Sequence, residues 1–484
     1  MSVKGRAGSG TQQKKRKNMT RIVVIGGGIS GLVTAWQLQQ LAARQGRAIQ
    51  LLLVEKEPRC GGKIWSRQED GFLCEWGPNG FLDNKPATLE LCRQLGIEDR
   101  LLRSNDNARK RFIFSGNRLH RLPENGPMFL RSQLLSWPGK LRLVGEALVP
   151  AKRDGADETL GAFGRRRLGA EALDKLIAPM AGGIFAGDAE TMSVASCFPR
   201  IVQLERQYGG LLRAMVCLAR HKRAERKAGK AVASAAGPGG VLTSFAGGIA
   251  ELTETLRQQL GEAVISGVAV RRIEGMPGAY QLALADGRQL AAEALVCATP
   301  AYAAADLLEG LAPQAAEELR AIPYAPLQVV CCGYEQRQIA QDLNGFGYLI
   351  PKQEGCSVLG TLWDSSIFAG RAPQGQVLLR SMMGGATRPD VLDFSDEQVQ
   401  ALVRADLRRI LGIATPPPFI RVFRHERAIP QYLVGHADRL QRLRQLLQPL
   451  TGLYLTGNAY DGIGLNDCVA NGARVAEELL QQLA

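Results

Sequence analysis

The sequence has 484 residues, of which 45% are hydrophobic and 22% are charged, and a formal net charge of +14. This length exceeds what one hydrophobic core usually organises, so we expect two or three domains of ordinary globular composition. A membrane-spanning or secreted protein is not indicated. No apolar run approaches the ~18 residues of a spanning helix, and no apolar stretch follows the basic start, so we expect any membrane contact to be peripheral.

The chain opens with a basic segment, which we predict to be a disordered tail over residues 1–19. Six Lys and Arg residues stand before Met19 without an acidic residue among them, and such charge runs are usually solvated. No basic-aromatic module or nucleic-acid recognition fold accompanies this charge. We therefore predict no nucleic-acid partner.

The first ordered unit is predicted to be a β-α-β unit. Residues 21–25 form an apolar, β-branched run, residues 26–31 a glycine-rich turn, and residues 32–44 a segment of helical periodicity. A second apolar run, residues 49–54, ends at Glu55. Two strands joined through a helix run parallel to each other. The pattern therefore predicts a parallel sheet.

The rest of the chain divides into a helical part, a loop and further α/β segments. Residues 91–220 carry amphipathic segments broken by Pro and Gly, and residues 221–240 lack an apolar pattern, which predicts a flexible loop. Residues 301–422 alternate strands and helices, as a second α/β domain does. Further elements are expected over residues 241–245, 249–260, 263–273, 294–298, 452–456 and 467–483, with Asn466 or Asp467 as the cap of the last helix.

Cysteine and histidine usage argues against disulfides and metals. The ten cysteines form no C-x-x-C pair, and only Cys331 and Cys332 are adjacent. Without a secretory signal they are predicted to be reduced thiols of a cytoplasmic protein. The four histidines show no helix-face spacing, so no metal site is predicted.

The strongest local motif is the turn after the first strand, which consists of Gly26, Gly27, Gly28, Ile29, Ser30 and Gly31. Between a strand and a helix, the first glycine permits the tight turn and the third lets a pyrophosphate approach the backbone. Gly31 lets the helix and the strand pack closely. Glu55 closes the next strand, where a carboxylate accepts hydrogen bonds from an adenosine ribose. The motif predicts a dinucleotide-binding domain.

The residues after Glu55 indicate which dinucleotide is bound. This continuation contains Lys56, Arg59, Gly61, Gly62 and Lys63, and then a glycine-proline turn of Gly77, Pro78, Asn79 and Gly80. It resembles the signature of flavoprotein oxidases related to amine oxidases and phytoene desaturases, in which these residues lie along the flavin and its phosphates. Nicotinamide dehydrogenases do not usually carry it. The resemblance therefore implies FAD rather than NAD.

A second glycine-rich loop, residues 457–464, leads into the last predicted helix, whose N-terminus would face an anionic group. Its sequence G-N-A-Y-D-G-I-G, with G-G-I-F-A-G-D at residues 182–188 and I-P-Q-Y at residues 429–432, is similar to that of oxygen-dependent protoporphyrinogen oxidases. The resemblance spans about residues 20–483. It implies further FAD contacts at Val270, Asn458, Ile463, Gly464 and Leu465.

The elements and the resemblance together predict an α/β fold with a discontinuous Rossmann-type FAD-binding domain. We assign residues 20–90, 241–300 and 423–484 to this domain. A mainly helical insertion over residues 91–220 and a second α/β, substrate-binding domain over residues 301–422 complete the chain.

A porphyrinogen is a large apolar macrocycle with propionates at one edge, so its pocket should be mainly aliphatic and aromatic with one or two cations. The positions that match the family's pocket are Gly183, Phe346, Leu349, Leu362 and Met383; the alternative is that they are plain core residues. Arg111 matches an arginine that holds a propionate, with an ordinary surface arginine as the alternative. The candidate acceptor of the pyrrole proton is the Gly183 carbonyl or solvent.

The reaction that the resemblance implies is the conversion of protoporphyrinogen IX to protoporphyrin IX in haem biosynthesis. FAD takes hydride in three rounds, and dioxygen reoxidises the flavin with release of hydrogen peroxide. Coproporphyrinogen III oxidases also resemble the sequence but tend to lack an arginine at position 111. An amine oxidase, a carotenoid desaturase or a flavin-free prenyl-protein escort are further alternatives, although the intact Glu55 and Gly61 argue against the escort.

The helical part also predicts a contact surface. Its apolar and basic residues are Phe129, Leu130, Arg131, Leu134, Leu135, Trp137, Lys140 and Arg142. Such a surface suits anionic lipid, a channel lining or a protein partner, and delivery of a porphyrin to ferrochelatase would suit either contact. We expect a cytoplasmic protein, free or peripheral on the inner face of the cell membrane, and leave a homodimer open.

Overall fold

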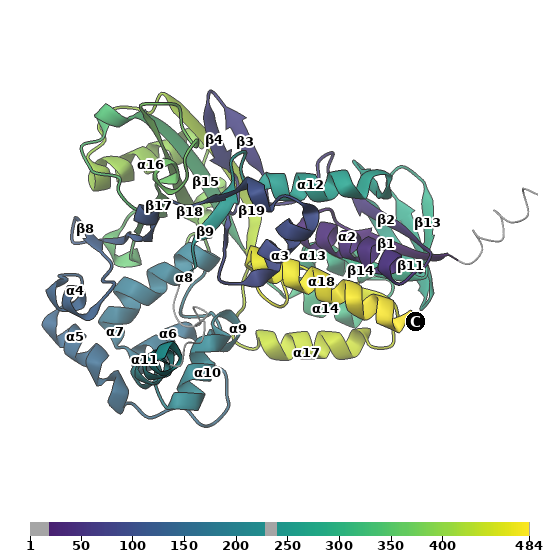
Figure 1. The fold of residues 1–484 in the computed structure, drawn as a ribbon, viewed down its shortest axis with the longest axis horizontal. Helices are drawn as coiled ribbons and strands as arrows, with labels where there is room; N and C mark the ends of the chain where they lie inside the picture. The colour runs from purple at the N-terminus through teal and green to yellow at the C-terminus, as the bar shows by residue number, and fades with distance from the viewer. Residues whose placement is uncertain (1–18, 228–239, 484) are drawn as a thin grey trace, which may run out of the picture.

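The computed structural model describes residues 19–227 and 240–483. Most of the predicted tail and of the predicted loop, residues 1–18 and 228–239, lie outside the described residues. Figure 1 shows a lobe built on the parallel sheet, a second lobe built on a larger sheet, and a group of helices below that larger sheet.

The first lobe contains a five-stranded sheet in the order β10-β2-β1-β14-β20, with all pairs parallel. Its strands are β1 (Thr20–Ile25), β2 (Ile49–Glu55), β10 (Val264–Ser266), β14 (Ala294–Cys297) and β20 (Leu453–Leu455). Successive residues of β1 face opposite layers, with Ile22 and Val24 in one core and Val23 and Ile25 in another. The predicted Rossmann-type α/β fold is confirmed.

Helices cover one face of this sheet (Figure 1). They are α2 (Ile29–Arg44), α3 (Pro86–Leu95), α12 (Ala250–Leu260) and α18 (Leu465–Gln482). The helices α2 and α18 approach closely because Gly472 carries no side chain: a Cβ there would lie 3.0 Å from the Ser30 carbonyl oxygen. The Thr34 hydroxyl uses this approach to donate to the Gly472 carbonyl at 3.1 Å.

The other face is covered by a three-stranded antiparallel sheet and three helices. They are β11 (Val270–Met276), β12 (Ala279–Leu284), β13 (Gln289–Ala292), α13 (Ala301–Leu308), α14 (Pro313–Arg320) and α17 (His436–Leu447). Residues 301–322 were predicted in the second α/β domain, but they pack in this lobe. The strand predicted over residues 263–273 is two strands, because the chain turns at Gly267 (φ +79°). Val270 therefore begins a strand instead of lying within one.

The second lobe is a seven-stranded sheet in the order β19-β15-β18-β17-β16-β7-β8. Its strands are β19 (Phe419–Pro430), β15 (Tyr324–Glu335), β18 (Gln376–Gly384), β17 (Val358–Leu362), β16 (Gly347–Leu349), β7 (Arg111–Ser115) and β8 (Arg118–Arg121). The helix α16 (Asp396–Leu411) covers one face. Residues 111–121 were predicted in the helical part, but β7 pairs in parallel with β16. β19 runs to Pro430, seven residues beyond the predicted boundary at 423.

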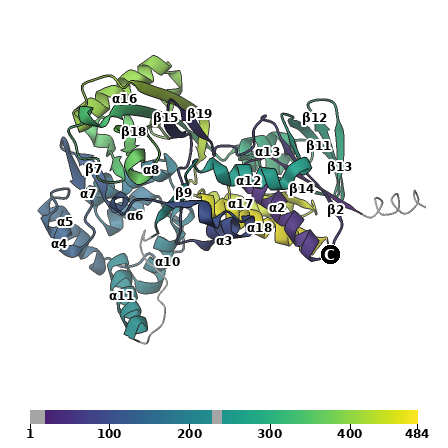
Figure 2. The same cartoon turned by 45° about the horizontal axis from the view of Figure 1, so that its top comes forward.

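The helical part lies below the large sheet, and Figure 2 shows its helix α11 projecting away from the other helices. Its helices are α4 (Gly126–Arg131), α5 (Trp137–Val144), α6 (Leu160–Arg167), α7 (Ala170–Ala172), α8 (Ala178–Phe185), α9 (Val194–Cys197), α10 (Pro199–Tyr208) and α11 (Leu211–Lys227). α11 extends over residues 221–227, which were predicted as loop. Within residues 19–227 and 240–483, no helix combines the length and the apolarity that a membrane span requires.

A buried ion network holds these helices together. The Arg167 guanidinium is fully buried and lies 2.7 Å from Glu205 and 3.1 Å from Glu146. The Glu146 carboxylate also accepts hydrogen bonds from the first two backbone amides of α11, at 2.8 and 3.0 Å. A buried charge is tolerated only when it is paired and hydrogen-bonded in this way. The network therefore fixes the start of α11 against α6 and α10.

Short sheets link the two lobes. β3 (Ser66–Glu69) pairs with β4 (Phe72–Glu75), and β9 (Leu242–Phe245) lies between β5 (Phe81–Leu82) and β6 (Leu101–Arg103). The chain thus crosses between the lobes several times, and the segment between β4 and β5 carries the predicted Gly77–Gly80 turn.

Candidate functional site

The glycine-rich turn before α2 forms an open cradle. Gly26 has φ +105°, and a Cβ there would lie 2.9 Å from the Ala298 carbonyl oxygen, while a Cβ at Gly31 would lie 1.9 Å from the Gly26 carbonyl oxygen. A Cβ at Gly28, in contrast, would meet nothing within 4 Å. No side chain caps α2, and its first turn has no acidic residue. The amide donors of the helix N-terminus therefore face open space, as a pyrophosphate requires.

Glu55 shapes this cradle at the end of β2. Its carboxylate accepts the Gly27 amide at 2.5 Å and the Glu57 amide at 2.8 Å, and the side chain is buried. A carboxylate has about four lone-pair sites, so two remain for ribose hydroxyls. The neighbouring Lys56 side chain is exposed and lies 3.4 Å from Glu57, so the structure does not bring it into the cradle.

The loop over residues 59–63 lies across the glycine-rich turn. The Gly61 amide donates to the Gly27 carbonyl at 2.7 Å, and Gly61 bridges to Gly28. The Arg59 guanidinium donates to the Gly62 carbonyl at 2.8 Å and to the Ile64 carbonyl at 3.0 Å. Arg59 thus holds its own loop in shape, a role that was not predicted.

Lys63 joins this loop to the second lobe. Its ammonium group donates to the carbonyls of Arg427, at 2.8 Å, and of Ala428. Burial lowers the pKa of the Lys63 amine to about 8, because no carboxylate compensates the charge. A nearby anionic ligand would raise that pKa. The backbone of Lys63 also lies against the next turn, since a Cβ at Gly77 would be 2.3 Å from the Lys63 carbonyl oxygen.

Several buried polar atoms at the carboxyl edge of the parallel sheet and at the Gly77–Gly80 turn lack a hydrogen-bond partner within the described residues. They are the Thr299 and Thr456 hydroxyls, the Asn79 amide nitrogen and the Trp76 indole nitrogen. Thr299 follows β14 and Thr456 follows β20, at the carboxyl edge of the parallel sheet. Ligands of such sheets bind at this edge, and buried polar groups normally have a partner. The residues present therefore fit a polar dinucleotide.

The loop over residues 457–464 ends where α18 begins. The helix starts directly after Gly464 and has no side-chain cap. The prediction that Asn466 or Asp467 caps this helix is therefore wrong. The Asn466 amide instead donates to the Leu82 carbonyl at 2.9 Å, and Asp467 lies 2.6 Å from Lys85. Ile463 packs against the helical part. The uncapped helix N-terminus leaves amide donors free for a ligand.

The predicted substrate residues divide over the two faces of the large sheet. Arg111 and Leu362 both pair with Gly347, and Leu349 and Met382 both pair with Gly360. Paired residues lie on the same face of a sheet, so Arg111, Leu362 and Leu349 lie on the face opposite α16. Met383 was predicted in the pocket, but it packs under α16 in the core of the lobe. Because side chains alternate along a strand, Met382 and not Met383 lies on the face opposite α16, which we call the site face.

The site face is opposed by the helix α8. A Cβ at Gly183 would lie 2.6 Å from Leu349 Cδ2, so a side chain at this position would require Leu349 to move. At the rim, the Arg111 guanidinium lies 5.1 Å from the ring centre of Phe346, a cation–π distance. Phe346 and Leu362 pack with Ile367 and neighbouring residues. Gly183 and three further predicted pocket residues, Phe346, Leu349 and Leu362, therefore lie on this side of the sheet, with the Arg111 cation at its edge.

Sequence reasoning missed residues that connect the lobes. Arg380, on the site face of β18, donates to the Gly77 carbonyl at 2.7 Å and pairs with Asp364 at 2.8 Å, with both side chains buried. No sequence signal marks Arg380. Tyr432, in contrast, stands in the I-P-Q-Y motif that was noted but was given no role.

Comparisons with known proteins agree with this geometry. The sequence pattern of the family described as flavin containing amine oxidoreductase matches residues 29–480. Coproporphyrinogen III oxidase of Bacillus subtilis is 30% identical over 472 residues, which cover 96% of this chain and 98% of the relative. Chloroplastic protoporphyrinogen oxidase of Nicotiana tabacum is 32% identical over 472 residues, covering 94% and 85%. A crystal structure of a proposed protoporphyrinogen oxidase from Exiguobacterium is 27% identical with a TM-score of 0.81, covering 96% and 99%. The chain therefore belongs to the flavin containing amine oxidoreductase family and is an FAD-dependent oxidoreductase.

Proposed function

We propose that the protein oxidises protoporphyrinogen IX to protoporphyrin IX in haem biosynthesis, with dioxygen as the final electron acceptor. The observation that carries this proposal is the face of the large sheet that α8 opposes. This face is apolar at Leu349 and Leu362, and Arg111 lies at its edge. A macrocycle that is apolar in its body and anionic at one edge matches this distribution. The names of the similar oxidases support the same substrate class.

The residues that would hold FAD come from both ends of the chain. Gly26 to Gly31 and Glu55 would hold the pyrophosphate and the ribose, and Gly61 to Lys63 would cover them. The Gly77–Gly80 turn, Val270 and the loop from Asn458 to Leu465 complete the predicted set. When bound, FAD supplies the hydride acceptor that no side chain can provide.

The chain's own residues would position the substrate and exclude water. Leu349 and Leu362 would contact the macrocycle, and Arg111 would pair with a propionate, a charge-assisted contact that also fixes orientation. The helix α8 ends at Phe185, so the Gly183 carbonyl has no amide donor from a following helical turn among the described residues. This carbonyl is our proposed acceptor of the pyrrole proton.

The test is turnover of the purified protein with protoporphyrinogen IX and coproporphyrinogen III in parallel. Porphyrin fluorescence and flavin absorbance would be followed first without oxygen and then with it. We expect flavin bleaching before oxygen is admitted, and a higher kcat/KM for protoporphyrinogen. Arg111→Ala should raise KM, and Arg111→Lys should restore part of the loss because it keeps the charge.

Each other outcome has a distinct meaning. Preference for coproporphyrinogen would keep the chemistry and change the substrate, in line with the 30% identity to the Bacillus subtilis enzyme. A flavin-bound protein that turns over neither porphyrinogen would refute the proposed substrate class and favour an amine oxidase or desaturase activity.

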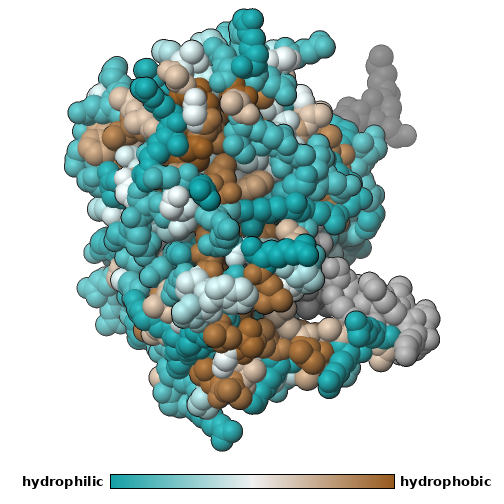
Figure 3. All heavy atoms as spheres, turned by 90° about the vertical axis from the view of Figure 1, so that its left-hand side faces the viewer, coloured by the Kyte–Doolittle hydropathy of each residue, from teal (hydrophilic) through white to brown (hydrophobic). Residues whose placement is uncertain are grey.

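We further propose that the helical part contacts an anionic membrane from one side. Figure 3 shows apolar side chains gathered on this face, and its exposed residues are Leu130, Trp137, Leu141, Val144, Leu148, Met215 and Val216. Leu134 and Leu135, which were also predicted on this surface, are buried in the protein, as is Lys140. Basic Arg131 and Arg213 are exposed beside the apolar residues. This pairing of apolar and basic groups suits lipid.

Vesicle flotation tests the membrane contact. Wild-type protein should float with anionic vesicles, whereas Trp137→Ser with Leu141→Ser should not, and Met276→Ser, which changes an exposed apolar residue of the other lobe, is the control. Equal flotation of all three proteins would contradict this contact. Dimerisation and a contact with ferrochelatase stay predictions.

A further inference from the structure

The loop over residues 457–464, which we propose faces the flavin, is bonded near both of its ends by one phenol hydroxyl. The Tyr432 hydroxyl donates to the Asn458 carbonyl at 2.8 Å and accepts the Gly462 amide at 3.0 Å. It thereby joins two backbone groups four residues apart, next to glycines with φ of +143° and +114°. These backbone conformations are accessible to glycine but provide no stiffness of their own.

Tyr432 is itself fixed from several directions. Its ring stacks on His436, with centroids 4.2 Å apart and planes 11° apart, and its carbonyl accepts the Ser193 amide at 2.8 Å. Burial lowers the pKa of His436 to about 4, so the stacked imidazole is neutral in ordinary buffers. The adjacent Gln431 donates to the Phe185 carbonyl at 2.9 Å. The segment 431–436 thus links the end of α8, which carries Gly183, to the loop.

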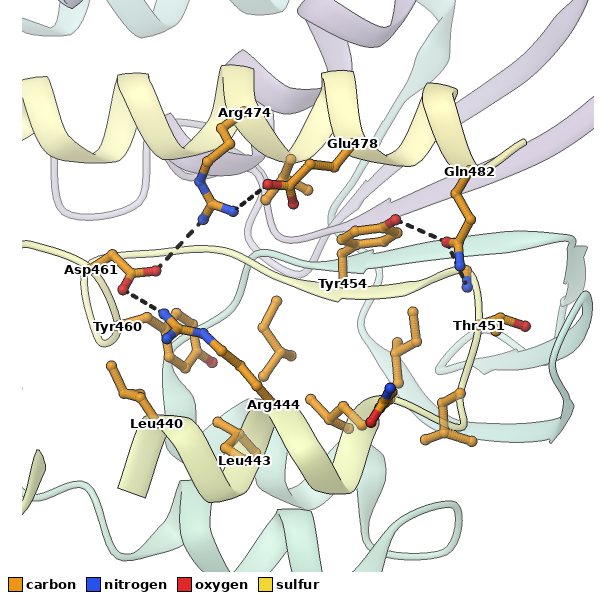
Figure 4. Close-up of a pocket in the computed structure, with 17 residues that line it drawn as sticks. Leu440, Leu443, Arg444, Thr451, Tyr454, Tyr460, Asp461, Arg474, Glu478 and Gln482 are labelled. Atoms are coloured by element: carbon orange, nitrogen blue, oxygen red, sulfur yellow. Dashed lines mark hydrogen bonds and ion pairs between the residues drawn. The ribbon is translucent and has the colours of Figure 1, made fainter. Parts of the chain in front are cut away.

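The outer side of the loop has polar and apolar links, and Figure 4 shows its ion pairs. Asp461 pairs with Arg444 of α17 at 2.7 Å and with Arg474 of α18 at 3.6 Å, and its carbonyl accepts the Asn471 amide at 3.0 Å. A cavity of about 320 Å³ lies between these helices behind the loop. Ala459 and Tyr460, in the middle of the loop, are buried in the same hydrophobic core as Leu440 and Leu443 of α17. Apolar packing therefore anchors the middle of the loop, while the Tyr432 hydroxyl bonds the backbone at Asn458 and Gly462.

We propose that Tyr432 is a positioning residue that sets the loop 457–464 against the flavin and couples it to α8. This inference rests on the proposed function, because the loop's contact with the flavin comes from that proposal. Tyr432 is not a catalytic residue, since both of its hydroxyl contacts are with backbone. This role accounts for the Tyr of the I-P-Q-Y motif.

The test compares Tyr432→Phe with Tyr280→Phe. Tyr280 is a matched control, because it is also buried and its hydroxyl donates to the Thr451 carbonyl at 2.8 Å, in the core on the other face of the parallel sheet. Each variant loses a phenol hydroxyl and keeps its ring. The measurements are the FAD dissociation constant, the flavin absorption spectrum, the flavin midpoint potential, and kcat and KM with the porphyrinogen that the wild type prefers.

In Tyr432→Phe, two part-buried backbone groups lose their partner. We expect FAD to bind about tenfold or more weakly, the flavin spectrum and potential to shift, and kcat to fall while KM stays within about twofold. Tyr280→Phe should change stability only. His436→Ala removes the stacking partner and the 3.4 Å contact of the imidazole with the Tyr460 carbonyl but keeps the Tyr432 hydroxyl. It should shift the flavin spectrum in the same direction by less, and it serves if Tyr432→Phe does not fold.

Wild-type FAD affinity, spectrum and potential in both Tyr432→Phe and His436→Ala would overturn the inference and leave the proposed function intact. Equal flavin changes in Tyr280→Phe would also overturn it, since they would indicate a general response to lost stability. A wild-type protein that binds FAD without oxidising a porphyrinogen would refute the proposed function, while the comparison of flavin properties would still decide the role of Tyr432.

Discussion

Replacing Gly183 by alanine is predicted to displace Leu349 in the proposed substrate site without unfolding the protein. The added Cβ would lie 2.6 Å from Leu349 Cδ2, whereas carbon atoms in contact are ~3.5–4.0 Å apart. Leu349 must therefore withdraw by about 1 Å or change its rotamer. Overpacking of this kind costs about 1–3 kcal/mol. Because Leu349 lies on the wall that we propose contacts the macrocycle, most of this cost should appear on substrate binding.

The neighbouring glycine offers a matched control. A Cβ at Gly182 would approach only Leu359 Cδ2, at 4.0 Å, which is an ordinary contact. Gly182→Ala should therefore be neutral or stabilise α8 by up to about 1 kcal/mol through helix propensity. Both substitutions add the same methyl group to the same helix, so their difference reports the contact with Leu349.

Steady-state turnover and thermal unfolding together provide the assay. We expect Gly183→Ala to lower kcat/KM by about tenfold to a hundredfold, as ~1.4 kcal/mol corresponds to one tenfold step, while its unfolding temperature stays near that of Gly182→Ala. Adding Leu349→Ala should restore room and recover part of the activity. Equal kcat/KM for the two alanine variants would refute the argument that α8 and Leu349 border the proposed substrate site.

Three further predictions concern the cradle and the helical part. Gly28→Ala should leave the unfolding of the flavin-free protein unchanged, since its Cβ would meet nothing within 4 Å. It should weaken FAD binding at least ~10-fold, because the methyl group would occupy the space of the pyrophosphate. Unchanged affinity in a flavin titration would contradict this prediction. Lys63 has a pKa of about 8 when folded and an ordinary value of 10.5, so the unfolded chain binds the extra proton between these pH values. The stability of the flavin-free wild type relative to Lys63→Met should therefore rise by up to about 3 kcal/mol from pH 8 to pH 10.5 and stay flat below pH 7, as denaturant unfolding at several pH values would show. Arg167→Met leaves the buried Glu146 carboxylate without its ion pair, while Glu205 keeps Arg166 at 2.7 Å, and should cost about 3–5 kcal/mol in the helical part, seen as faster hydrogen exchange in α11. Arg165→Met, which removes a half-exposed ion pair, should cost less than about 1 kcal/mol.

The Rossmann-type unit could be predicted because its signals are local. A strand, a glycine-rich turn and a helix follow one another within 25 residues, and Gly26 and Gly31 meet steric needs that the structure shows. The turn at Gly26 requires a positive φ, and the packing at Gly31 excludes any side chain. Such requirements are visible in the sequence before any long-range contact is known.

Long-range pairing was the part that sequence could not supply. β7 is five residues long and joins the large sheet only through residues more than 200 positions later, so its local pattern carried no such information. The choice between Met382 and Met383 depends on strand register, and a shift of one residue moves a side chain to the other face. Tyr432 was visible as a motif, but its hydroxyl partners at Asn458 and Gly462 appear only in the fold.

The discontinuity of the nucleotide-binding lobe has a consequence for its synthesis. The contact between Thr34 and Gly472 spans 438 positions of the chain, so α2 leaves the ribosome long before the helix that covers it. At ~5–20 residues per second, this interval is on the order of 20–90 s. During that time, the apolar surface of α2 and the edge of β1 stay unburied in the nascent chain. We expect this protein to depend on chaperones that shield its N-terminal third until the last helix has been made, and an excess of N-terminal fragments to aggregate when translation stops early.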